Sequence, residues 1–423
     1  MMRAIAHPTA ALAAAVMAFA LMDAAPLAAQ ASITPGPARV SAVAAAAPIA
    51  LDDIAALSAT DLRSLEGDAG GALRSLADDT SPAEAARWWA DTDVAARGAL
   101  IDEVPDLIGR LDGIDAADRV AANRIGARDR LRRIDRRLAA LAESDPASDP
   151  AAHSAERDAL HLERDYLSRV ARGLVQLYLY APDRGALVEM AGDPSAATSI
   201  LFVVPGTNAS LASFMVDDPV TSFADWQVAN ADAAAPVLAF TVLAAPMPQI
   251  SMNLAGGPQN NTIATAAGAD YARIVRGIDV AFPGLPTLSY EHSAGSAVGS
   301  AAEMDGARFD ARFLAAGVGA TDGYTPIAGT SYYAAQAKED VNRYYAGFQV
   351  GDIGYGIGPE EFPGITIVDP GFREPAGGGT VTAMLAQGLD LHNRLFSGDG
   401  TANGTVLKDV RLLLASLAHE SSG

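Results

Sequence analysis

The clearest signal of the fold lies in Pro286-Thr-Leu-Ser-Tyr-Glu-His-Ser-Ala-Gly-Ser-Ala-Val-Gly-Ser-Ala-Ala-Glu303, where a short apolar run meets a segment of small residues at Ser293. This pattern is typical of a sharp strand-to-helix turn that exposes a serine hydroxyl, usually G-x-S-x-G. Small neighbours are needed there because the serine backbone is strained and the helix passes close to the strand. Gly295 supplies the second glycine, whereas Glu291 replaces the first. The alternative is an ordinary strand-to-helix turn that happens to contain a serine.

Around this turn, apolar runs of strand length alternate with helical stretches, and the alternation predicts an α/β fold. Several runs are nearly continuous, as expected for parallel strands that helices cover on both faces. We therefore expect a mostly parallel sheet of about eight strands. The expected strands cover residues 177–180, 186–190, 200–204, 237–243, 287–290, 313–316, 331–335 and 365–368.

Residues 51–175 show helical patterns instead, so we expect a helical region before an α/β domain over residues 176–423. Within that region, apolar residues recur at three- and four-residue steps over 121–142 and 155–177, and charged residues fill the other faces. Two such stripes predict an antiparallel helical hairpin. The second stripe runs on to Leu174 and Leu177.

The N-terminus has the pattern of an export signal over residues 1–31. Arg3 precedes an apolar stretch over residues 9–22, and Ala29-Gln-Ala31 offers a small-residue cleavage site. Residues 32–50, rich in alanine and proline, are typical of a linker. No other stretch approaches the ~20 apolar residues of a membrane span. We therefore expect a secreted or extracytoplasmic protein; a disordered or membrane-anchoring N-terminus is the alternative.

Composition excludes several classes of function. The formal net charge of −21 argues against nucleic acid and anionic membrane surfaces as partners. The chain has no cysteine, so it has no disulfide, no thiolate metal site and no cysteine nucleophile. Sequence motifs for phosphate loops, dinucleotide binding and zinc proteases are absent. We expect neither a cofactor nor a metal.

A serine hydroxyl is a poor nucleophile until an imidazole takes its proton, and histidine is scarce in this chain. His292 adjoins Ser293 and points to the opposite face of the strand, so it cannot easily be the base. His392 is favoured, because we expect it in a glycine- and aspartate-rich loop region after the last strand. A surface loop histidine is the alternative reading of His392. His419, near the C-terminus, is the alternative base, and the others lie in the expected signal or the hairpin (His7, His153 and His161).

The third member of such a site is a carboxylate that orients the imidazole and stabilises its cation. In the chain order serine, acid, histidine, the acid lies between the two residues just discussed. Asp340 follows the expected strand at 331–335 by a few residues and is the first candidate, with Asp352 and Asp369 as alternatives.

Two backbone amides should hold the negative charge that develops on the substrate oxygen. One comes from the residue after the serine, which is Ala294, and one from the loop after an earlier strand. The apolar strand at 200–204 ends in a Pro-Gly turn, where the amides of Thr207 and Asn208 are candidates. The alternative is a common strand-end turn without a catalytic role.

Four segments carry a family resemblance: Arg87-Trp-Trp-Ala90, Val104-Pro-Asp-Leu-Ile-Gly-Arg-Leu-Asp-Gly-Ile114, Val204-Pro-Gly-Thr-Asn208 and Glu291-His-Ser-Ala-Gly-Ser296. Together they resemble an actinobacterial α/β-hydrolase family of undetermined physiological function. Its members have a W-W segment and a P-E-L-I-G-N-L-D-G-I-P-like stretch in a helical region, a V-P-G-T-G-like strand end and a G-H-S-Y-G-S elbow. The resemblance covers roughly residues 80–415.

The resemblance implies an α/β-hydrolase fold in which Ser293 is the nucleophile, Asp340 the acid and His392 the base. This chain departs from the family pattern at three positions. They are Glu291 for glycine, Ala294 for tyrosine and Asn208 for the second glycine of the oxyanion turn.

The leading prediction is a secreted serine hydrolase that cleaves a small-molecule ester or amide through an acyl-enzyme. Glu291 should either force a wider turn or place a negative charge near the oxyanion, which would oppose catalysis. The alternative is therefore a catalytically degenerate hydrolase fold that acts as a secreted or envelope-associated binding protein. The substrate, the acyl-chain preference and the oligomeric state stay open.

Overall fold

The computed structural model describes residues 49–143, 149–250, 260–344, 346–347, 349–350, 353–372 and 381–421. The expected signal over residues 1–31 lies outside these ranges, as do all but the last two residues of the expected linker. Asp352, one of the alternative acids, also lies outside them. None of the helices in the described ranges is long and apolar enough to cross a membrane.

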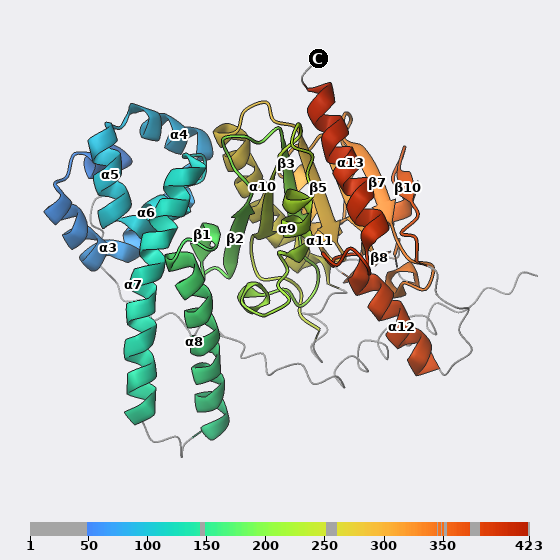
Figure 1. Ribbon diagram of the computed structural model, residues 1–423, viewed down its shortest axis with the longest axis horizontal. Coiled ribbons are helices and arrows are strands. Elements are labelled where there is room, and N and C mark those ends of the chain that lie inside the picture. Colours follow the sequence, from blue (N-terminus) through green and yellow to red (C-terminus); the bar gives the residue numbers. More distant parts are fainter. Residues whose placement is uncertain are drawn as a thin grey trace, which may run out of the picture.

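A mixed, mostly parallel sheet of eight strands forms the centre of the protein (Figure 1). Its spatial order is β1-β2-β4-β3-β5-β6-β7-β10, and β8 and β9 form a separate small hairpin. β2 pairs antiparallel with β1 and β4, whereas every pair from β4 to β10 is parallel. The predicted α/β fold with a mostly parallel sheet of about eight strands is therefore confirmed. The strands are β1 (Gln176–Ala181), β2 (Ala186–Ala191), β3 (Ser199–Val204), β4 (Val237–Leu243), β5 (Thr287–His292), β6 (Ala311–Ala315), β7 (Ser331–Ala335), β8 (Gln349–Val350), β9 (Ile353–Gly354) and β10 (Thr366–Val368).

Helices cover both faces of the sheet, which is why its central strands are apolar without alternation. Every residue of β3 and β4 is buried. On one face Phe202 packs edge-on against Tyr271 of α10, with ring centroids 6.0 Å apart. On the other face Val203 shares a core with Val410 of α13. The covering helices are α9 (Ser222–Ala229), α10 (Asn261–Ala281), α11 (Gly295–Met304) and α13 (Gly404–Glu420), and α12 (Val381–Arg394) precedes α13 in the chain.

The helical region before the sheet has a core of its own, which includes Trp88, Trp89 and Leu107. Its two longest neighbouring helices, α7 and α8, run side by side and project beyond the rest of the protein (Figure 1). The helices are α2 (Leu51–Ala55), α3 (Ala59–Asp79), α4 (Pro82–Asp91), α5 (Val94–Glu103), α6 (Pro105–Arg110), α7 (Ala116–Glu143) and α8 (Pro150–Ala171).

The second hairpin helix ends earlier than its apolar stripe predicts. It stops at Ala171, because Gly173 has a φ of +75° and its amide donates back to the Val170 carbonyl (2.8 Å). Leu174 is consequently 65% exposed, and Leu177 belongs to β1 instead of the helix.

The Leu-Asp-Gly-Ile segment connects the helical region to the sheet domain through Asp112. This buried carboxylate accepts from Arg119 Nη1 (2.9 Å) and from Arg273 Nε of α10 (2.7 Å). Arg273 also donates to the carbonyls of Ala77 (2.6 Å) and Thr80 (2.9 Å) at the end of α3. One charge-assisted network therefore holds α3, α7 and α10 together.

Replacing Asp112 with alanine should lower the free energy of unfolding by about 3–5 kcal/mol, because it leaves the fully buried Arg119 without its counter-charge. Urea denaturation of the purified protein measures this loss. Asp165→Ala, which removes an exposed carboxylate from α8, is the control and should change stability by less than about 0.5 kcal/mol. Equal stabilities of the two variants would contradict the role given to Asp112.

Candidate active site

Ser293 stands on a sharp turn between β5 and α11. Its φ of +54° is left-handed, a conformation that is uncommon for a residue with a side chain. Its amide donates to the Ala315 carbonyl at the end of β6 (3.0 Å), and its carbonyl accepts from Ser296 Oγ (2.9 Å). The turn is therefore held by the neighbouring strand on one side and the first turn of the helix on the other.

Two glycines let the loop after β3 lie directly against this turn. A Cβ on Gly206 would lie 2.6 Å from Ser293 Cβ, and one on Gly295 would lie 2.7 Å from the Val204 carbonyl oxygen. Neither position has room for a side chain, so glycine is required by close approach of the backbone. Because parallel strands end at the same edge of a sheet, the loops after β3 and β5 meet there.

Glu291 neither widens the turn nor leaves an unpaired charge beside it. Its fully buried carboxylate accepts from Arg312 Nε (2.8 Å) and Nη2 (2.6 Å), and from Ser289 Oγ (2.7 Å). Gly299 on α11 makes the space, since a Cβ there would overlap the carboxylate. The expected conflict between Glu291 and the turn is thus removed by one arginine and one glycine.

The same arginine is shared with a second buried carboxylate. Arg312 Nη1 donates to Glu303 Oε2 (2.6 Å), and Tyr324 donates to the same oxygen (2.5 Å). Burial raises the pKa of Glu291, while the Arg312 charge opposes that rise. The neighbouring carboxylates raise the pKa of Arg312 well above its usual value, so the guanidinium stays charged.

His392 lies on α12, near its C-terminal end, and not in the loop region that we expected. Sequence alone missed this because residues 381–394 follow a glycine-rich stretch, which is typical of loops. His392 Nδ1 lies 3.1 and 3.2 Å from the two carboxylate oxygens of Asp340. Because a carboxylate accepts, Nδ1 carries the hydrogen and Nε2 is left as the basic nitrogen.

Asp340 is the carboxylate that the structure brings to His392. It is fully buried and follows β7 by a few residues, and its Oδ1 also accepts from the Asn342 amide (2.8 Å). Asp369, an alternative acid, accepts from the Gly371 amide (2.9 Å) in the loop after β10. His419, the alternative base, lies in the last turn of α13.

His392 lies beside the serine turn, because its imidazole ring contacts the ring of His292. The two imidazole rings have centroids 4.7 Å apart, and His292 directly precedes Ser293. Within the described residues no hydrogen bond joins Ser293 Oγ to His392. Hydrogen bonds of this kind are often long in a ligand-free site and shorten when a substrate binds.

The backbone amides that we expected to bind the oxyanion differ in whether they already donate a hydrogen bond within the protein. Ala294 precedes α11, so its amide is among the donors that a helix start leaves without an intrahelical partner. The amide of Asn208 already donates to the Pro248 carbonyl (2.9 Å), which leaves Thr207 as the candidate from the loop after β3. Asn208 instead supports that loop: its φ is +67°, and its side chain accepts from the Ile250 amide (2.8 Å). Asparagine tolerates this left-handed conformation better than most residues with a side chain.

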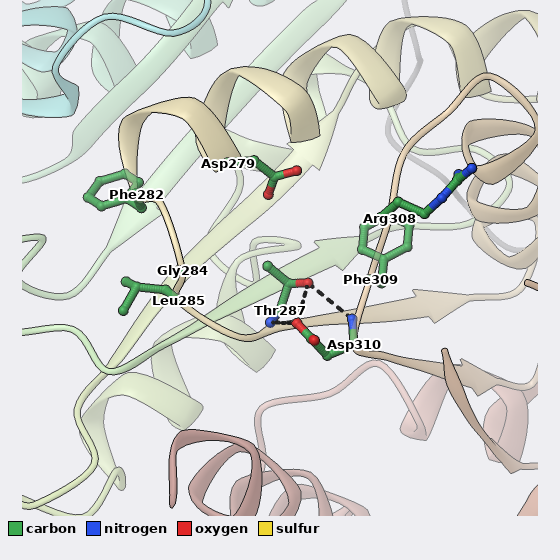
Figure 2. A pocket seen from close by; sticks show the side chains of 8 residues that line it. All are labelled: Asp279, Phe282, Gly284, Leu285, Thr287, Arg308, Phe309 and Asp310. Carbon is green, nitrogen blue, oxygen red and sulfur yellow. Dashed lines mark hydrogen bonds between the residues drawn. The ribbon is translucent and has the colours of Figure 1, made fainter. Parts of the chain in front are cut away.

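A separate hollow of about 260 Å³ lies at the other end of the parallel strands. Figure 2 shows residues that line it, among them Thr287 and Asp310, which are joined by hydrogen bonds, and Asp279 on the neighbouring helix. Thr287 begins β5 and Asp310 precedes β6, whereas Ser293 follows the carboxyl end of β5. The hollow is therefore not part of the candidate active site.

Comparisons with known proteins do not assign the chain to a family. No protein-family model matches the chain, and a search of curated proteins returned no similar sequence.

Acid should destabilise the protein partly through His292. Burial and the neighbouring His392 lower the pKa of His292 from 6.5 to about 3. Between these values the unfolded chain binds a proton that the folded protein does not, so the free energy of unfolding falls as the pH falls. We expect the difference in stability between the natural protein and His292→Gln to change by about 1.4 kcal/mol per pH unit between pH 6 and 4.

Urea denaturation at several pH values measures this difference. The control is Ser64→Ala, which removes an exposed side chain without a titratable group from α3 and should leave the pH dependence unchanged. An identical pH dependence in the natural protein and His292→Gln would show that His292 is not held neutral by the fold.

Proposed function

We propose that the protein is a serine hydrolase of the α/β-hydrolase type, which cleaves a small-molecule ester or amide through an acyl-enzyme. The observation that carries the proposal is the left-handed Ser293 on the turn after β5, with the His392–Asp340 pair beside it. A strained serine on a strand-to-helix turn and a carboxylate-oriented imidazole are the two parts that such chemistry needs.

The connectivity supports the finer assignment to the α/β-hydrolase fold. The serine follows β5, the acid follows β7 and the histidine follows β10, in the chain order serine, acid, histidine. The loop after β3 lies against the serine turn, where this fold places its second oxyanion donor. The segments that resemble the actinobacterial hydrolase family point in the same direction.

In the proposed reaction, Ser293 Oγ attacks the carbonyl carbon while His392 Nε2 takes the hydroxyl proton. Asp340 stabilises the resulting imidazolium through Nδ1, and the amides of Ala294 and Thr207 bind the oxyanion. Collapse of the tetrahedral intermediate expels the alcohol or amine, which receives the proton from His392. Water then attacks the acyl-enzyme, with His392 as base, and releases the carboxylic acid and the free serine.

The competing proposal of a non-catalytic binding protein rested on the charge of Glu291 and on the helical N-terminal region. Arg312 pairs with that charge in a buried bidentate contact, so the charge does not argue against a developing oxyanion. We therefore favour the hydrolase. We also propose that it works outside the cytoplasm, because residues 1–31 have the pattern of an export signal.

A fluorophosphonate probe should label the purified protein at Ser293, because only an activated serine reacts with it. Ser293→Ala should abolish labelling and lower the hydrolysis of p-nitrophenyl acetate on the order of 10³-fold or more. Peptide mass spectrometry identifies the labelled residue. Ser64→Ala, which removes an exposed serine from α3, is the matched control and should behave like the natural protein. Full hydrolysis by Ser293→Ala would end the proposal.

Asp340→Asn should lower kcat by about 10³- to 10⁴-fold, because the amide favours the wrong tautomer of His392 and cannot stabilise its cation. Steady-state hydrolysis of the same ester measures the effect. Asp369→Asn is the control, since its carboxylate caps the turn at Gly371. The assignment of the acid is wrong when Asp369→Asn loses activity and Asp340→Asn keeps it.

A further inference from the structure

We propose that His292 is a positioning residue, which holds the main chain of His392 and thereby sets the place of the base beside Ser293. The proposal rests on the proposed hydrolase function. His292 Nε2 lies 3.0 Å from the carbonyl oxygen of His392. Because that oxygen can only accept, His292 carries its hydrogen on Nε2 and donates it to the backbone of the base.

The carbonyl that His292 binds is one that α12 leaves without a helical partner. His392 is among the last four residues of α12, whose carbonyls have no intrahelical donor. The Phe396 amide, which would reach the His392 carbonyl in a longer helix, donates to Asn393 instead (3.0 Å). Since His392 is buried, leaving this carbonyl without a donor would destabilise the end of α12.

The ring of His292 is fixed on both sides. It stacks on Phe396, with ring centroids 4.9 Å apart and planes inclined by 27°, and its other neighbour is the His392 ring. The His292 side chain is only 6% exposed. The Nε2–H group of His292 therefore points in one direction. The position of the His292 ring thus fixes the main chain of His392.

A second side chain of β5 acts on the same helix end. Tyr290 lies two residues before His292, so both point to the same face of the strand. The Tyr290 hydroxyl donates to the Leu395 carbonyl, just beyond α12. The strand that carries the nucleophile thus also carries two donors that fix the end of α12, so one rigid element determines the spacing between serine and base.

The neutral state of His292 also suits its role in positioning His392. A cation beside His392 would oppose the imidazolium that forms during catalysis. Burial and the His392 charge lower the pKa of His292 to about 3, so it stays neutral while His392 takes and returns its proton.

The test compares two variants that differ in the donor. His292→Phe keeps a ring that can stack on Phe396 but has no hydrogen to donate, whereas His292→Gln keeps an N–H at a similar reach. We expect His292→Phe to lower kcat for p-nitrophenyl acetate by about 10- to 100-fold with KM within about twofold, because a misplaced base slows only the chemical step. His292→Gln should restore most of kcat.

Fluorophosphonate labelling rates should follow kcat in the same order. If His292→Phe does not fold, His292→Asn replaces it, because its shorter amide does not reach the His392 carbonyl. Equal kcat in the natural protein, the donor-free variant and His292→Gln would overturn the positioning role, as would a loss in His292→Gln as large as in His292→Phe. Absence of labelling at Ser293 in the natural protein would instead reject the hydrolase function itself.

Discussion

The buried charge of Arg312 is the interaction on which the serine turn depends. This side chain, from β6, binds Glu291 on β5 and Glu303 on α11, and it also donates to the Ser296 carbonyl (3.1 Å). It therefore joins the strand before the turn to the helix after it. All three charged groups are almost completely buried, so removing the arginine alone would leave two carboxylates without a counter-charge. The cluster stabilises this geometry only as a complete set.

Alternation along β5 keeps this charge apart from the proposed chemistry. Ser289 and Glu291 point to the face where Arg312 lies, while Tyr290 and His292 point to the face where α12 ends. Strand β5 therefore carries the buried ionic cluster on one face and uncharged hydrogen bonds to the end of α12 on the other. Ser293 follows β5 directly, so the contacts on both faces of the strand fix the position of the serine backbone.

The sequence predicted the parts of this arrangement that depend on local pattern. Apolar runs predicted the sheet, and the chain order pointed to Asp340 and His392, which the structure pairs; their catalytic roles remain predictions. The sequence could not predict what depends on tertiary partners. Glu291 looked disruptive because its partner Arg312 lies 21 residues away and its space comes from Gly299. The helix that carries His392 was not predicted, because a glycine-rich stretch, which is typical of loops, lies directly before it.

Backbone strain gathers at the end of the sheet where the proposed site lies. In the described part of the chain, the non-glycine residues with left-handed φ are Asn208 (+67°), Ser293 (+54°) and Ala316 (+49°), and they follow β3, β5 and β6. Each such conformation costs on the order of 1–3 kcal/mol and persists only where surrounding contacts fix it. Those contacts are present: the Ala316 amide donates to the Ala335 carbonyl (2.8 Å), and its carbonyl accepts from Asn342 (2.6 Å), two residues beyond the acid. Three strained loops at adjacent strand ends are difficult to explain by folding alone, because relaxed turns would connect the same strands at lower free energy. The strain is explained if the proposed chemistry requires the loops after β3 and β5 to place the oxyanion amides and the hydroxyl of Ser293 together, while the loop after β6 supports the loop of the acid.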